Sequence, residues 1–163
     1  MTVDAATRRR LLEQYLAGIA EVAAALEGIT PRELDHHPAP GKWSPREIVH
    51  HLADSEMVGV VRLRRVIAED GPAIPAYDQD VYARRLHYDR PIESSLEAFR
   101  AARRVNADLL ERLGEAEWAR EGTHSETGRF TITGWLETYA AHAHNHAAQI
   151  RRARAAATLT RES

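Results

Sequence analysis

Histidines in one stretch of the chain offer the clearest chemistry in this sequence. The segment HAHNH holds three of the nine histidines, at positions 142, 144 and 146. A helix turns by about 100° per residue, so His142 and His146 fall on the apolar face of a predicted helix, and His144 falls on the opposite face. Two imidazoles one turn apart can chelate one divalent ion. The alternative is a pair of packed histidines that bond to the backbone or to each other.

A second predicted helix supplies another candidate ligand. His50 and His51 are neighbours in the segment EIVHHLADSE. On an ideal helix, His51 lies at the edge of the apolar sector, whereas His50 lies nearly opposite that sector. A ligand in a helical bundle must project toward neighbouring helices, so His51 is the better candidate. Together with His142 and His146 it would give zinc, nickel or a similar ion three nitrogen ligands and leave a coordination position open.

An open coordination position would allow catalysis. Water bound there can reach a pKa of about 7, and a thiol can be held as a thiolate. Gln149 follows His146 by three residues, and we expect its side chain to hydrogen-bond the ring nitrogen of His146 that does not bind the metal. Asp54 stands in the same relation to His51, but we expect it at the surface. Arg62 lies further along the His51 stripe, where it could bind a substrate carboxylate or form an ordinary helix salt bridge.

Helix start signals define the elements that position these residues. The segments Thr30-Pro31-Arg32-Glu33 and Ser44-Pro45-Arg46-Glu47 each place a hydroxyl, a proline and a glutamate as a capping box requires. Together with apolar periodicity, such signals predict long helices at 5–28, 45–69, 93–113 and 133–156. Short helical turns are predicted at 31–35 and around Trp118, and a small hairpin or extended loop at 121–130.

Four long amphipathic helices predict an all-α fold, namely an antiparallel four-helix bundle. The length of 163 residues, without repeats or a linker, indicates a single domain over 1–163. The connection at 71–92 is longer than the usual bundle loop, and we expect an ordered crossover loop over 74–90.

Composition excludes several classes of function. The chain has 22 Lys+Arg and 24 Asp+Glu, a net charge of −2, which gives no electrostatic case for nucleic acid. Arginine pairs such as Arg103-Arg104 are interpreted as solvated helix faces. There is no cysteine, so disulfides, thiolate ligands and a cysteine nucleophile are excluded. No apolar run is long enough to span a membrane, and we expect a cytoplasmic protein without a membrane partner.

Three segments resemble the signature stretches of the DinB/YfiT-like metalloprotein family: GKWSPREIVHHLADSE, HSETG and HAHNHAAQI. Their order and spacing agree with the family over residues 35–152. The resemblance implies zinc or nickel at His51, His142 and His146, a four-helix bundle with a long crossover between its second and third helices, and a homodimer. His124 in HSETG matches a family position, which implies that it leans over the site and contacts the substrate.

The resemblance also implies an activity. Some family members resemble transferases that join a low-molecular-weight thiol to an electrophile, and others resemble metal-dependent hydrolases. We expect a divalent-metal enzyme in which the tris-histidine site activates a small thiol, with no catalytic side chain beyond that site. One alternative is hydrolysis by metal-activated water, although the histidine motif lacks the glutamate of HExxH. Another is a stress-associated metal-binding dimer without catalysis, which predicts a fully coordinated metal and no pocket beside it.

Overall fold

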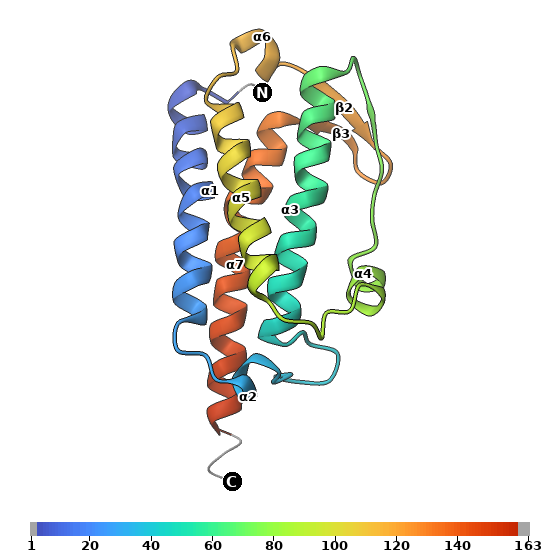
Figure 1. Ribbon diagram of the computed structural model, residues 1–163. Helices are drawn as coiled ribbons and strands as arrows, with labels where there is room; N and C mark the ends of the chain where they lie inside the picture. Colours follow the sequence, from blue (N-terminus) through green and yellow to red (C-terminus); the bar gives the residue numbers. More distant parts are fainter. Residues whose placement is uncertain (1–2, 160–163) are drawn as a thin grey trace.

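Four long helices form the body of the molecule, and the computed structural model describes residues 3–159. They are α1 (Ala5–Leu26), α3 (Pro45–Ala68), α5 (Glu93–Leu110) and α7 (Ile132–Leu159). Both α1 and α3 pack against α5 and α7. Figure 1 shows that α1 and α7 run in one direction and that α3 and α5 run in the other. The predicted all-α four-helix bundle is confirmed, and the shared direction of α3 and α5 requires a long connection that returns along the bundle.

The helices begin where the sequence places their caps. The Ser44 hydroxyl accepts a hydrogen bond from the Glu47 N–H, and the Glu47 carboxylate accepts one from the Ser44 N–H. Thr30 and Glu33 form the same capping box in front of the short helix α2 (Pro31–Leu34). Because these signals are local, the predicted start of α3 agrees with the structure. The predicted helix ends differ from the observed ones by a few residues, as is usual where helices fray.

The connection from α3 to α5 is more structured than the predicted loop. It contains β1 (Ala73–Ile74) and the short helix α4 (Gln79–Arg85), whose first turn is capped by the Asp78 carboxylate. The strand β1 pairs in parallel with β2 (Glu121–His124), which pairs antiparallel with β3 (Gly128–Thr131) to form the predicted hairpin. The predicted turn at Trp118 is α6 (Glu115–Trp118). Figure 1 shows the hairpin beside the upper end of α3 and α4 alongside its lower half.

Two apolar clusters fill the bundle. One contains Tyr15, Leu63 and Trp135, and the other contains Ile48 and Leu52. Each long helix contributes to both clusters with different segments, so the polar side chains between those segments meet in the middle of the bundle. None of the helices within residues 3–159 is long and apolar enough to cross a membrane.

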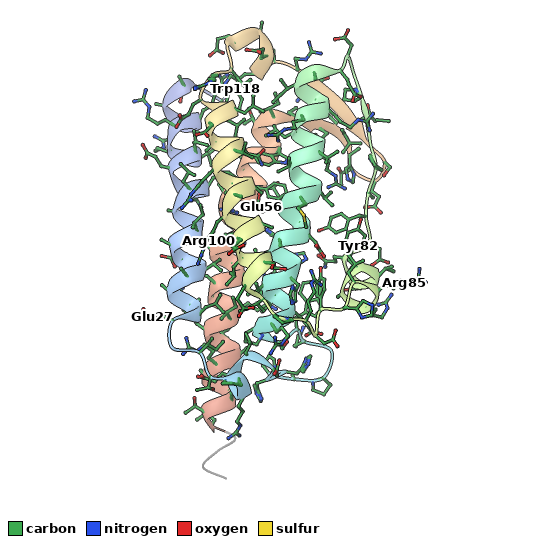
Figure 2. All side chains as sticks on the ribbon, in the orientation of Figure 1. Glu27, Glu56, Tyr82, Arg85, Arg100 and Trp118 are labelled. Atoms are coloured by element: carbon green, nitrogen blue, oxygen red, sulfur yellow. The ribbon has the colours of Figure 1, made fainter. Side chains whose placement is uncertain are left out.

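The polar layer between the clusters contains Arg103. This residue is fully buried, so its interpretation as part of a solvated helix face is wrong. Its Nε donates to Glu56 Oε1 at 2.7 Å, and its Nη atoms donate to the backbone carbonyls of Tyr15 and Tyr139. Glu56 is also fully buried, accepts a second hydrogen bond from the Tyr15 hydroxyl at 2.8 Å, and lies in the interior in Figure 2. Burial is tolerated because both ions have hydrogen-bond partners, and these come from other helices.

Candidate metal centre

Three histidine side chains converge inside the bundle. His51 comes from α3, and His142 and His146 come from successive turns of α7. One ring nitrogen from each lies within 4.8 Å of the other two, and Nε2 of His51 is 3.2 Å from Nε2 of His142. Within residues 3–159, these three histidines form the one group of histidine or acidic side chains whose ligand atoms lie close enough together to hold a metal ion. The structure thus brings together the three residues that the helical spacing selected.

These three residues fit a divalent ion. Burial lowers the pKa of His51 to about 3 and that of His142 to about 2, and it also lowers the pKa of His146. All three rings are therefore neutral at physiological pH and have a lone pair to offer. Two nitrogens bound at about 2.0–2.1 Å in a tetrahedral site lie about 3.3 Å apart, close to the observed separation of His51 and His142. The three ligand nitrogens all lie within 4.8 Å of one another, and the ring centre of His146 is 4.8 Å from that of His51 and 4.6 Å from that of His142.

The ring orientations also favour metal binding through Nε2. His146 Nδ1 lies 2.9 Å from Gln149 Oε1, so it donates a proton to that oxygen and leaves the Nε2 lone pair free. Buried Nδ1 atoms of His51 and His142 have no hydrogen-bond partner in the described part of the chain. Each can therefore keep its proton on Nδ1 and present Nε2. The expected position of Gln149 behind His146 matches this geometry.

His50 and Asp54 are buried, contrary to expectation. His50 donates from Nε2 to the Arg90 carbonyl at 3.0 Å and accepts at Nδ1 from the Ser95 hydroxyl at 2.8 Å. Asp54 accepts a hydrogen bond from the Tyr88 hydroxyl at 2.6 Å. The outer side of α3 is covered by the end of the crossover and the start of α5, which local periodicity could not show. Both nitrogens of His50 are engaged away from the histidine cluster.

A pocket of about 380 Å³ opens beside His51 and His142. Its walls come from α3, the crossover, the β2–β3 hairpin and α7, and they include Ser55, Arg62, Tyr77, Arg129, Phe130 and Tyr139. Arginine, hydroxyl and aromatic groups line it, and none of the residues within 3–159 that line it is an aspartate or glutamate. A site of this size and enclosure can hold a small molecule next to a metal ion.

Tyr139 forms the floor of the pocket next to His142. Its hydroxyl donates to the Ser55 carbonyl at 2.9 Å, and burial raises its pKa to about 12, so it stays protonated at neutral pH. The ring can lie this close to α3 because residue 59 is glycine; a Cβ there would stand 2.7 Å from the tyrosine ring. Neither Tyr139 nor Ser55 is predicted as a site residue from the sequence. The signal that could have found Ser55 is its position one turn after His51.

The two expected substrate contacts have different surroundings. Arg62 lines the pocket, donates to the Pro75 carbonyl, and lies with its guanidinium 5.5 Å from the centre of the Tyr77 ring. His124 is not among the lining residues. Its ring stacks on Phe130, and its Nδ1 accepts from backbone N–H groups in the hairpin turn. The hairpin thus reaches the pocket through Phe130 and its neighbours rather than through His124.

The fold and the site together define a helical bundle with an inward three-histidine centre and an adjoining pocket. A family model for the DinB superfamily matches residues 14–150. The chain belongs to the DinB superfamily, as its resemblance to DinB/YfiT-like proteins predicted.

Individual relatives support the same assignment. A protein of Oceanobacillus iheyensis named "Putative metal-dependent hydrolase OB0782" is 36% identical over 118 residues, which are 72% of this chain and 69% of that protein. A Bacillus mycoides protein with a similar name is 28% identical over 80% of this chain and 75% of its own length. The solved structure of YfiT from Bacillus subtilis, described as "a probable metal-dependent hydrolase with an unusual four-helix bundle topology", superposes with a TM-score of 0.87 at 26% identity. It covers 93% of this chain and 87% of YfiT. The family, these names and the histidine cluster support a metal-binding DinB-like protein.

Proposed function

We propose that this protein is a thiol S-transferase in which His51, His142 and His146 hold one zinc or nickel ion. Such an ion lowers the pKa of a thiol that reaches it, so that the sulfur is present as thiolate at neutral pH. The substrates would be a low-molecular-weight thiol and a small electrophile. No side chain of the protein has to form a covalent bond.

The observation that carries this proposal is the absence of an aspartate or glutamate from the lining of the pocket. Activation of water for hydrolysis ordinarily uses a general base within hydrogen-bond reach of that water. A thiol does not need one, because its proton can leave to solvent once its pKa has been lowered. The histidines themselves are low-pKa groups whose lone pairs would be committed to the ion.

The pocket suggests how the remaining steps proceed. The thiol loses its proton to solvent, its sulfur forms a bond to the electrophilic carbon, and the leaving group departs with the electron pair of the broken bond. The Tyr139 hydroxyl and the aromatic walls hold the reactants away from bulk water next to His142. Arg62 gives the pocket a positive charge that favours an anionic nucleophile, whereas Arg129 pairs with Glu121.

Hydrolysis is the second candidate, because the relatives from Oceanobacillus iheyensis and Bacillus mycoides are named as metal-dependent hydrolases. It would use water in place of the thiol in the same pocket. A metal-binding role without catalysis predicts no pocket beside the ligands, whereas a pocket is lined by both His51 and His142.

The test begins with metal analysis of untagged protein and of the variants His51→Ala, His142→Ala and His146→Ala. We expect about one metal per chain in the wild type and loss of at least tenfold in metal affinity in each variant, because each removes one of three ligands. His144→Ala is the matched control, since His144 lies on the same helix and bonds to the Gln14 carbonyl of α1 instead.

Activity then separates the candidates. Each protein is assayed for conjugation of small thiols to a chromogenic aryl halide and for hydrolysis of a chromogenic ester. Conjugation that follows metal content supports the proposal. Hydrolysis of the ester without conjugation of a thiol would contradict the transferase proposal and favour a hydrolase. Full metal binding in the three histidine variants would contradict the assignment of the metal ligands.

A further inference from the structure

Arg62 is a cation in the pocket that has no acidic partner. Of the ion pairs within residues 3–159, none includes Arg62, whereas its neighbour Arg65 pairs with Glu69 at 2.8 Å. The side chain of Arg62 is half-buried, and its Nε–H is buried without a hydrogen-bond acceptor in that part of the chain. A buried N–H group without an acceptor is unfavourable, but the guanidinium as a whole is only partly buried and lines the pocket, so a ligand there can reach its Nη groups.

The crossover holds Arg62 in place. One Nη donates to the Pro75 carbonyl, and the Tyr77 ring lies against the guanidinium at 5.5 Å. Both contacts leave other N–H groups of the fork available, since arginine has five. These contacts fix the orientation of the side chain without neutralising its charge, which suits the recognition of a planar or tetrahedral anion.

The nearby charged side chains are engaged with other groups, and Asp54 lines an adjoining hollow together with Arg62. The Asp54 carboxylate accepts the Tyr88 hydroxyl and forms no ion pair with Arg62. The other arginine of the pocket, Arg129, pairs with Glu121 on its own hairpin at 2.7 Å. Among the described residues that line the pocket none is acidic, and Arg62 is the arginine there without an ion pair.

We propose that the substrate of this site carries an anionic group, a carboxylate or a phosphate, which binds Arg62 while the reacting end of the same molecule lies at His51 and His142. This inference rests on the proposed function only in that it places the substrate beside the metal centre. It adds the charge and the length of the substrate, and it favours anion binding by Arg62 over the ordinary helix salt bridge.

The spacing along α3 sets the length of that substrate. Arg62 follows His51 by eleven residues, a rise of about 16 Å, and its side chain leans back toward the start of the helix. The distance to be bridged is therefore on the order of 10 Å. A substrate with its anionic group several bonds from the reacting atom fits, and a very short acid such as acetate cannot reach both points.

The experiment measures binding by calorimetry in zinc-loaded protein, with no turnover required. The probes are the dicarboxylates succinate, adipate, suberate and sebacate, compared with monocarboxylates of equal length. We expect suberate to bind at least tenfold more tightly than octanoate, because only suberate can meet both the metal centre and Arg62. A phosphonate in place of the far carboxylate shows which anion is preferred.

Arg62→Met should abolish the preference for suberate over octanoate, and Arg62→Lys, which keeps the charge, should retain part of it. Arg65→Met is the matched control: it removes one positive charge from the next turn of the same helix, where Arg65 is engaged by Glu69, and should leave the preference intact. Equal affinity of suberate and octanoate in the wild type would overturn the proposal. An equal loss in Arg62→Met and Arg65→Met would overturn it as well.

Failure of the proposed function has a different signature. If the protein holds no zinc, octanoate is compared with uncharged octanamide on metal-free protein. Tighter binding of octanoate that disappears in Arg62→Met would support the anion site alone, and the lack of any difference would overturn it.

Discussion

At the scale of single residues, the environment of a histidine decides its role. His50 and His51 are adjacent in the chain, yet both nitrogens of His50 bond to protein groups, whereas Nδ1 of His51 bonds to none in the described chain. His50 therefore fixes structure, and His51 has a lone pair to give to a ligand. His142 resembles His51 in this respect, and His146 is oriented by Gln149.

Gln149 gives a prediction at this scale. Gln149→Ala removes the acceptor at His146 Nδ1, so the ring loses both its orientation and part of its basicity. We expect metal affinity to fall about tenfold to a hundredfold. Competition with a chromophoric chelator measures it. Gln149→Glu keeps an acceptor oxygen and should bind metal nearly as well as the wild type; unchanged affinity in Gln149→Ala would show that the contact does not orient the ligand.

The three clustered histidines could be predicted because helical angle places His142 and His146 on an apolar face, and places His51 at the edge of one, closer to the core than His50. Arg62 and Gln149 follow from the same angles. The burial of His50 and Asp54 could not be predicted, because the groups that cover them, Arg90 and Tyr88, lie more than thirty residues further along the chain. The 3.6-residue periodicity of apolar residues indicates which side of a helix faces the core. It gives no information about a crossover segment that covers the opposite side.

At the scale of elements, local signals predicted the bundle helices, and long-range pairing decided the crossover. The capping boxes at Thr30 and Ser44 involve residues three apart and were sufficient. The strand β1 forms only because β2, about fifty residues later, lies beside it. The helix α4 has a local cap in Asp78, but the preceding Pro75 and the tyrosines favoured a loop interpretation. In Figure 2, Tyr82 of α4 lies on the side that faces α3, where it lines a surface hollow.

His50 anchors the end of this crossover, which gives a prediction for the element. His50→Ala removes one buried and one partly buried hydrogen bond and leaves a cavity, so we expect a loss of about 2–4 kcal/mol in the free energy of unfolding. Hydrogen exchange in residues 86–92 should become faster. Ser95→Ala removes only one of the two bonds and should cost about 1 kcal/mol. If exchange in 86–92 were the same in wild type and His50→Ala, other contacts would be holding the crossover.

At the scale of the whole molecule, one buried ion pair connects all four long helices. Arg103 on α5 bonds to Glu56 on α3, to the Tyr15 carbonyl on α1 and to the Tyr139 carbonyl on α7. Tyr139 in turn lines the pocket one turn before His142, so the same layer supports the floor of the site. Gly18 of α1 leaves the space that the Arg103 guanidinium fills, since a Cβ there would stand 2.5 Å from Nη1.

Removing the cation should destabilise the whole bundle. Arg103→Met leaves the Glu56 carboxylate buried without a counter-charge, and we expect a loss of about 3–5 kcal/mol at pH 7, measured by denaturant unfolding. The double variant Arg103→Met/Glu56→Gln has no buried charge and keeps an acceptor for the Tyr15 hydroxyl, so it should lose less than Arg103→Met alone. A double variant as unstable as the single one would mean that the lost hydrogen bonds to α1 and α7 dominate.

The pH dependence of the same variants separates charge from packing. Burial raises the pKa of Glu56 in the folded protein, and Arg103 opposes that rise, so the pKa is raised further in Arg103→Met. A carboxyl whose pKa is higher in the folded state than in the unfolded state binds its proton more tightly when folded, and stability then falls as pH rises through that interval. The part of the penalty that comes from the unpaired carboxylate should therefore be complete above the raised pKa and should disappear below the unfolded value of about 4.3. Unfolding curves at a series of pH values should show the variant approaching the wild type in acid.

The double variant is the control. Since Glu56→Gln removes the titrating group, the stability of the double variant should differ from that of the wild type by an amount that varies much less with pH. An equally flat difference for Arg103→Met would assign the instability of that variant to packing.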